Sequence, residues 1–337
     1  MKRFFLTSTV LLILLLSVAA LLAWQKVEDL HQPMPVQDAQ LFEIPSGANL
    51  AQVSKALERE GFIDDARAWY WLARYRKLDR NIKAGEYELQ PGLSAVDAMQ
   101  KFVEGRVVLH SVTFVEGWTA QQALETLIAH PGIEQTLDIN DSAAVLAAIG
   151  TDYAHLEGLL YPSTYKFGRG TRDVDILRQS YQLLERQLAS AWAGRDTEAP
   201  LESPYELLTM ASIIEKETAR DDEREQISGV FARRLKKRMR LETDPTVIYG
   251  IGPSYDGDIR RKDLRTDTPY NTYTRFGLTP TPIALAGTRA LQAAAHPAPG
   301  KTLYFVATGE PDGSHYFSET YEEHEKAVAR YLARLRQ

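Results

Sequence analysis

The chain has 337 residues, of which 44% are hydrophobic and 25% are charged, and its formal net charge is −6. This is the composition of a folded globular protein, so it excludes a disordered tail protein, a collagen-like chain and a coiled-coil rod. The absence of cysteine excludes disulfides, zinc ribbons, iron–sulfur clusters and a thiol nucleophile. Because no large basic field is present, nucleic acid is not expected as a partner.

The chain begins with the pattern of a membrane-spanning helix. Residues 4–24 carry no charge and, at a rise of about 1.5 Å per residue, are long enough to cross roughly 30 Å of hydrocarbon. Lys2 and Arg3 precede them, so the positive-inside rule predicts residues 1–3 in the cytoplasm and the remainder exported. A cleaved signal peptide is the alternative, with a weak cleavage site at 17–20, but the apolar run continues beyond it.

A small module is expected after this helix. Residues 31–40 hold two prolines and no periodicity, which predicts a linker over 25–40. A strand ending at Ile44, two helices and a second strand follow. This strand–helix–helix–strand order makes 41–108 resemble a LysM-like glycan-binding subdomain; a packing module that binds nothing is the alternative.

A larger region opens at 112–119, where a strand runs again into glycine and then a helix. The segment 156–165 follows with one acid, two tyrosines and a proline in an expected loop, and by itself it predicts no function. Further helices are expected over 203–220 and 223–238. Two strands, 303–307 and 315–317, and a last helix, 322–335, end the chain.

The helix that begins at Ser203 carries two glutamates near its end. Met210 and Ile214 recur at helical spacing, and Glu217 continues their apolar face, whereas Glu215 lies roughly 200° away, toward the flank. Burial favours the protonated form of a carboxyl group, and a proton donor to a glycosidic oxygen needs that property. The alternative is structural, with Glu217 paired to a Lys or Arg at the helix end.

Polar and aromatic residues fill the segments that follow. Asp244-Pro245 followed by threonine predicts a turn, and loops are expected around 270–273 and 293–297. Together with SIIEKETA, the motifs RLETDPTVIYG, YNTYTRFGL and AAAHP, in this order, resemble the YceG-like family of bacterial endolytic murein transglycosylases. The likeness extends over essentially the whole chain. One departure is the segment 277–280, where the family has proline after leucine.

The resemblance implies an α+β protein of the bacterial inner membrane, with a LysM-like subdomain at 41–108 and a periplasmic catalytic YceG-like domain at 109–337. Its expected activity is that of a lyase. It cleaves the bond between N-acetylmuramic acid and N-acetylglucosamine inside glycan strands, leaves 1,6-anhydromuramyl ends and so terminates nascent strands. No cofactor and no metal are implied. Peptidoglycan strands are the implied substrate, and penicillin-binding proteins are implied partners.

The resemblance also assigns roles to individual residues. The family glutamate maps to Glu217, with Glu215 as the fallback. Residues implied to line the substrate cleft are Glu215, Asp244, Thr246, Tyr249, Tyr270, Asn271 and Tyr273. Two alternatives stay open: a muramidase-type hydrolase in which Asp244 serves as the second carboxylate, and a non-catalytic glycan-binding scaffold for cell-wall synthesis.

Overall fold

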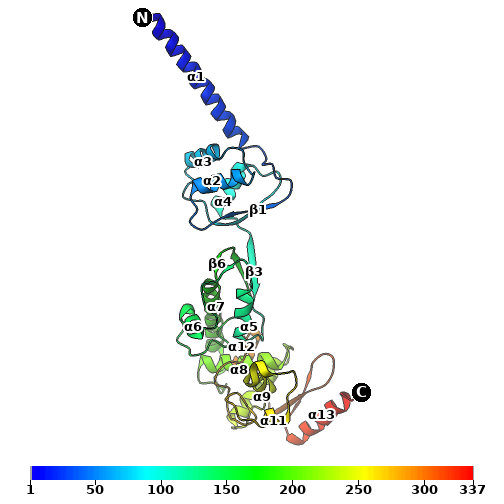
Figure 1. The fold of residues 1–337 in the computed structure, drawn as a ribbon. Helices are drawn as coiled ribbons and strands as arrows, with labels where there is room; N and C mark the ends of the chain where they lie inside the picture. Colours follow the sequence, from blue (N-terminus) through cyan, green and yellow to red (C-terminus); the bar gives the residue numbers. More distant parts are fainter. Residues whose placement is uncertain (1, 337) are drawn as a thin grey trace. The chain divides into compact units, whose positions relative to one another are not determined.

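The structure, a computed structural model, describes residues 2–336 and divides into two compact units (Figure 1). Unit 1 holds the residues up to His110 together with Lys166–Gly170, and unit 2 holds Ser111–Tyr165 and the residues from Thr171 onward. Both units contain helices and strands. The predicted α+β class is therefore confirmed.

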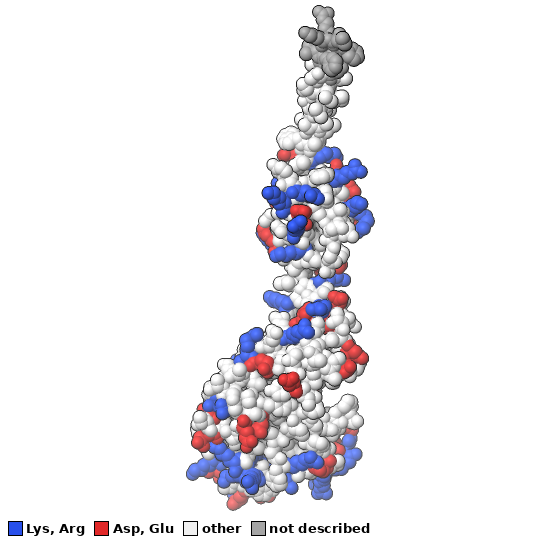
Figure 2. Space-filling model, turned by 90° about the vertical axis from the view of Figure 1, so that its left-hand side faces the viewer, with Lys and Arg blue, Asp and Glu red and all other residues white. Residues whose placement is uncertain are grey.

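Helix α1 (Lys2–Asp29) contains the apolar stretch. Its segment Thr9–Asp29 is long and apolar enough to cross a membrane. Charged side chains are absent from 9 to 25, and Figure 2 shows this part of the helix as uncharged atoms. The helix continues five residues beyond the expected end at position 24.

The predicted linker over 25–40 is wrong. Residues 25–29 belong to α1, and Leu30, Met34 and Val36 are buried in the core of unit 1. The Met34 amide also donates a hydrogen bond to the carbonyl oxygen of Leu93 (2.9 Å). These apolar residues follow no helical or strand period, so the sequence pattern gave no sign that they would pack.

Unit 1 is built around a two-stranded antiparallel sheet of β1 (Gln40–Ile44) and β2 (Gly85–Leu89). Helices α2 (Leu50–Arg59) and α3 (Ala66–Tyr75) connect the strands, and α4 (Ala95–Glu104) follows the second strand. Aromatic rings fill the core, which contains Phe42, Trp69, Tyr87 and Phe102. The indole N–H of Trp69 donates to the carbonyl oxygen of Ala95 (3.1 Å), so the one polar atom of that ring is satisfied.

Two further two-stranded sheets are formed by strands that precede helix α7 in the sequence. Strand β3 (Leu109–Thr113) pairs with β5 (Thr164–Gly168), and β4 (Ile133–Glu134) pairs in parallel with β6 (Thr171–Arg172). Helices α5 (Ala120–Ile128) and α6 (Ser142–Ile149) lie between these strands in the sequence.

Unit 2 is centred on helix α8 (Pro204–Glu217), which begins as predicted at the capping residue Ser203. Every residue from Leu207 to Ile214 is buried, because four helices pack around α8. These are α7 (Asp173–Gly194), α9 (Arg224–Lys236), α10 (Asp244–Ile251) and α12 (Thr288–Ala295). The middle of the helix is therefore buried on all sides, including the polar side chains of Thr209 and Ser212, and not on one face only.

Two expectations about loops in unit 2 are wrong. The turn expected at Asp244-Pro245 is the first turn of α10, where proline is well tolerated because its missing N–H has no helical partner. The segment 293–297 begins as the last turn of α12, whose alanines pack against α8.

The remaining elements close unit 2. Gly252–Ser254 forms a short 3-10 turn, and α11 (Arg261–Arg265) follows. Strands β7 (Tyr304–Ala307) and β8 (His315–Ser318) form the predicted antiparallel hairpin, on which α13 (Tyr321–Arg334) packs.

Candidate active site

Glu217 is the last residue of α8 and is half-buried. The hydroxyl of Thr243 donates a hydrogen bond to its Oε1. Burial raises the pKa of Glu217 to about 7; the Thr243 bond opposes this rise, and the negative charge of Asp244 adds to it. A carboxyl group in this setting is partly protonated at neutral pH, as a general acid requires.

The hydroxyl groups of Thr246 and Thr272 hold the backbone of Thr243, the residue that contacts Glu217. Thr243 precedes α10 and holds the position of a capping residue, yet its hydroxyl makes no bond to the helix. Its backbone N–H donates to Oγ1 of Thr272 (3.1 Å), and its carbonyl oxygen accepts from the hydroxyl of Thr246 (2.7 Å). Backbone contacts thus hold Thr243 in place and leave its side chain to Glu217.

Asp244 and Tyr273 lie beside this acid. The Tyr273 hydroxyl donates to Oδ1 of Asp244 (2.6 Å), and Asp244 itself is exposed. Burial, followed by the charges of Asp244 and Glu217, raises the pKa of Tyr273, so this phenol stays protonated and is a hydrogen-bond donor. The structure thus brings Glu217, Asp244 and Tyr273 close together, and their contact with substrate stays a prediction.

Thr246 and Asn271 are both buried, and their polar atoms bond within the protein. The hydroxyl of Thr246 lies 2.9 Å from that of Thr272. The side-chain amide of Asn271 donates to three carbonyl oxygens between Asp263 and Thr266 and accepts from the Tyr273 N–H (2.8 Å). In this arrangement the two side chains hold the loop that carries Tyr273. Their contact with substrate stays a prediction.

Sequence reasoning missed a second half-buried carboxyl group, Glu157. Its Oε1 accepts from the backbone N–H of Ala120 (2.9 Å), and its Oε2 accepts from the hydroxyl of Tyr249 (3.2 Å). Burial raises the pKa of Glu157 to about 7, against the lowering effect of these bonds. The residue lies in an irregular segment without periodicity, so no pattern signalled its burial.

Two neighbours explain the local shape around Glu157. Gly158 has φ +78°, and a Cβ there would lie 2.4 Å from Cβ of Pro282, so only glycine fits. The rings of Tyr249 and Tyr270 meet edge to face, with centroids 4.9 Å apart, and the Tyr270 hydroxyl lies 2.9 Å from Oγ1 of Thr281. Residues at the two ends of α10 therefore contact the two carboxyl groups: Thr243 bonds to Glu217, and Tyr249 bonds to Glu157.

Glu215, which helical phase placed toward the flank of the helix, forms a buried ion pair. Its Oε1 lies 2.8 Å from Nη1 of Arg224, and these side chains are 4% and 7% exposed. Its Oε2 accepts from the backbone N–H of Gly287 (2.9 Å). The phase argument failed because α8 is enclosed on every side. Both carboxylate oxygens of Glu215 are occupied, which makes Glu217 the better proton donor of the two.

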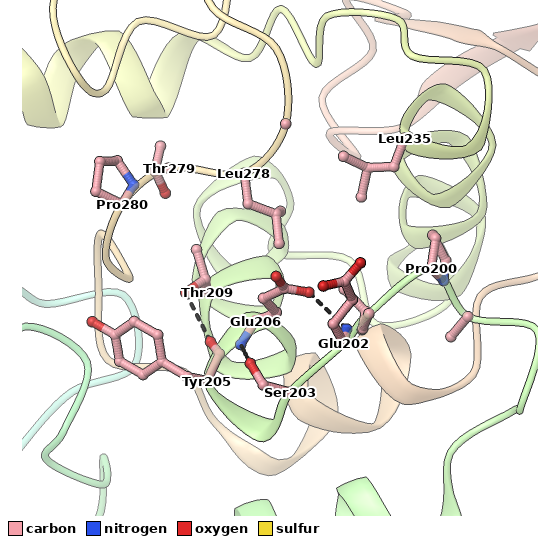
Figure 3. A pocket seen from close by; sticks show the side chains of 13 residues that line it. Pro200, Glu202, Ser203, Tyr205, Glu206, Thr209, Leu235, Leu278, Thr279 and Pro280 are labelled. Carbon is pink, nitrogen blue, oxygen red and sulfur yellow. Dashed lines mark hydrogen bonds between the residues drawn. The ribbon is translucent and has the colours of Figure 1, made fainter.

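A hollow of about 750 Å³ lies at the other end of α8 (Figure 3). Tyr205, Glu206 and Thr209 of α8 line it, facing the loop with Leu278, Thr279 and Pro280. None of the predicted site residues is among its lining residues. Among residues 2–336, no three His, Asp or Glu side chains are grouped as metal ligands would be.

Comparison with known proteins decides the family. Residues 42–330 match the YceG-like family. The chain belongs to this family. It is also 31% identical to an endolytic murein transglycosylase of Bacillus subtilis over 86% of this chain and 84% of that protein.

Two further YceG-like comparisons agree. An endolytic murein transglycosylase of Streptococcus pneumoniae is 25% identical over 97% of this chain, which spans 65% of that longer protein. A yceG-like protein from Listeria monocytogenes, known from a 2.6 Å crystal structure, is 32% identical, with a TM-score of 0.54 over 86% of this chain and 99% of that one. The YceG-like assignment therefore rests on sequence and on structure.

Proposed function

We propose that this protein is a membrane-anchored endolytic murein transglycosylase. It cleaves the bond between N-acetylmuramic acid and N-acetylglucosamine inside glycan strands and leaves 1,6-anhydromuramyl ends. The observation that carries this proposal is the carboxyl group of Glu217 at the end of α8, which is hydrogen-bonded by Thr243 and lies near Asp244, in surroundings that raise its pKa. The names of the Bacillus and Streptococcus relatives support it.

Glu217 acts first as an acid and then as a base. Its protonated carboxyl donates to the bridging oxygen as the glycosidic bond breaks, and the muramyl C1 gains oxocarbenium character. The resulting carboxylate takes the proton of the C6 hydroxyl on the same sugar, and this oxygen then bonds to C1. The bond from C1 to the bridging oxygen is thus replaced by a bond from C1 to O6 of the same muramyl residue, and the bridging oxygen leaves as a hydroxyl of the N-acetylglucosamine. No water is consumed, and Glu217 returns to its protonated form.

The position of Asp244 favours a second candidate, a muramidase-type hydrolase. A hydrolase needs a second carboxylate as nucleophile or as base for water. Asp244 is exposed and near enough to raise the pKa of Glu217. In the transglycosylase reaction this carboxylate instead stabilises the positive charge that develops at C1.

The test is a digest of purified murein sacculi with the detergent-solubilised full chain, read by mass spectrometry of the new ends. Anhydromuramyl ends with the parent protein and none with Glu217→Gln are expected. The matched control Glu322→Gln, an exposed carboxylate on α13, keeps full activity. Reducing ends would instead establish the hydrolase, and binding without new ends would favour a glycan-binding scaffold.

We propose further that α1 anchors the chain in the inner membrane, with its N-terminus in the cytoplasm and both units in the periplasm. Lys2 and Arg3 at the start of the helix support this orientation. Periplasmic cell-wall synthases, the penicillin-binding proteins, are the proposed partners. A reporter fused after Gln337 that is active only when exported tests the orientation.

Unit 1 is proposed to be LysM-like and to bind glycan. Its order of one strand, two helices and an antiparallel strand supports this. A hollow of about 320 Å³ lies between β1 and α2 and is lined by Glu43, Ser46 and Gln52, among others. Retention of the Gln52→Ala variant on insoluble murein, compared with the parent chain, tests the assignment.

A further inference from the structure

We propose that one face of α3, composed of Arg67, Trp71, Arg74 and Tyr75, lies in the headgroup region of the bilayer that α1 crosses. We call these four residues the α3 face. The inference concerns unit 1 alone and rests on the membrane anchoring proposed above. It does not depend on the cleavage reaction.

The aromatic side chains of the α3 face are unusually exposed. Trp71 is 66% exposed and Tyr75 is 86% exposed, whereas Trp69 and Ala73 on the same helix are fully buried. Trp71 and Tyr75 are four residues apart, so they project from the same side of the helix. Large exposed aromatic groups of this kind mark a surface that contacts another phase or molecule.

The α3 face lies beside the point where α1 would leave the hydrocarbon. Helices α1 and α3 pack together, and Nζ of Lys26 lies 3.9 Å from a carboxylate oxygen of Asp65. A hollow of about 580 Å³ is lined by Ala23 and Val27 of α1 and by Trp71 and Tyr75 of α3, among others. These α1 residues flank Trp24, the last residue of the apolar stretch.

This continuity with the spanning helix sets the depth of the α3 face. A bilayer that surrounds the apolar part of α1 has its interface within about one helical turn of Trp24. Trp71 and Tyr75 border the same hollow as Ala23, one residue before Trp24, and Val27, three residues after it. Tryptophan and tyrosine are enriched in this interfacial layer, because each has an apolar ring and a polar atom.

The charges around these rings fit lipid phosphates. Arg67, Arg74, Arg76 and Lys77 are all exposed on α3 or directly after it. Nη1 of Arg74 also donates to the hydroxyl of Tyr70 (3.2 Å). Basic residues next to interfacial aromatics attract anionic headgroups. The same positive charge would repel the equivalent face of a second copy, so the bilayer is the occupant we favour.

The absence of cysteine from the chain gives a direct test. A single spin label is placed at position 75 through Tyr75→Cys in the full chain, reconstituted in vesicles of phosphatidylethanolamine and phosphatidylglycerol. Labels at Leu16→Cys, within α1, and at Lys55→Cys, exposed on α2, serve as references. Electron paramagnetic resonance then compares collisions with lipid-soluble oxygen and with a water-soluble nickel chelate.

The expected result is that label 75 collides less with nickel and more with oxygen than label 55, at a depth shallower than label 16. Label 75 with the aqueous values of label 55, while label 16 stays in lipid, would overturn the proposal and leave the anchor intact. Aqueous values at all three positions would overturn the anchor as well. Dipolar broadening between labels at 75 would assign the face to a second copy instead.

A second variant tests the two aromatic side chains with the spin label at another position. Trp71→Ser with Tyr75→Ser removes exposed rings only, so thermal unfolding is expected to match the parent chain. A label at Arg67→Cys is expected to gain access to nickel in this background. Unchanged access in the folded double variant would contradict the proposal, whatever the outcome of the murein digest.

Discussion

The hydroxyl of Thr243 is hydrogen-bonded to Oε1 of Glu217, although Thr243 stands where a side chain would ordinarily cap helix α10. The helix therefore gives up a capping bond, which is worth roughly 1 kcal/mol in typical helices. The contact directs the lone pairs of one carboxylate oxygen and leaves the other oxygen to carry the transferable proton. The hydrogen bond from Thr243 thus orients the carboxyl group of Glu217, the proposed acid.

Thr243→Val is expected to lower kcat for murein cleavage about tenfold to a hundredfold, because the carboxyl of Glu217 loses its fixed orientation. The Thr243→Ser variant keeps the donor and is expected to retain most of the activity. Initial rates of release of anhydromuramyl ends measure both. Equal losses in the two variants would show that packing, and not the hydrogen bond, matters at this position.

Asp244→Asn is expected to shift the pH dependence of cleavage. The negative charge of Asp244 helps to raise the pKa of Glu217 to about 7, so its removal lowers that pKa. Glu217 must be protonated to act, and activity is lost as pH rises through its pKa. The alkaline limb of the kcat/KM profile therefore moves to lower pH, with a severalfold lower rate at pH 8. Asparagine still accepts the Tyr273 hydrogen bond, so the fold is retained.

An unshifted alkaline limb in Asp244→Asn would mean that another group controls it. Glu157, whose pKa burial also raises to about 7, is the first to examine. The same profile recorded with Glu157→Gln separates the two carboxyl groups.

Glu217→Gln is expected to stabilise the protein at alkaline pH. The folded carboxyl has a pKa of about 7 and the unfolded one about 4.5, so the folded state binds more protons between these values. Stability of the parent chain therefore falls as pH rises from about 4.5 to 7, whereas the glutamine variant has no such proton to lose. The difference reaches about 1–3 kcal/mol above pH 7 in denaturant unfolding. A difference that is independent of pH would contradict the raised pKa.

Glu215→Gln is expected to destabilise unit 2 by about 2–3 kcal/mol, because it removes the buried counter-charge of Arg224 and leaves this guanidinium only the half-exposed carboxylate of Asp221 (3.3 Å). The exposed pair Lys326–Glu322 provides the contrast, since its loss in Glu322→Gln is expected to cost less than about 1 kcal/mol. Thermal or denaturant unfolding distinguishes these values. A loss of activity in folded Glu215→Gln with unchanged stability would argue for a direct role in substrate contact.

The sequence predicted the elements that depend on local signals. The start of α8 at Ser203 and the C-terminal hairpin were identified because capping and alternation are local. The start of α10 was missed, since Asp-Pro-Thr suits both a turn and a first helical turn. For the site, resemblance grouped Glu217 with Asp244 and Tyr273, but Glu157 lies 60 residues earlier in an irregular loop. Its burial results from tertiary packing against α5 and α10, which no periodicity reports.

The burial of Leu30, Met34 and Val36 has a consequence for where the protein can work. Because these residues join the end of α1 to the core of unit 1, no flexible linker separates the proposed anchor from unit 1. The height of unit 1 above the lipid is therefore set by packing, unlike the variable reach of a flexible tether. The glycan binding proposed for unit 1 would therefore take place at a fixed distance from the membrane.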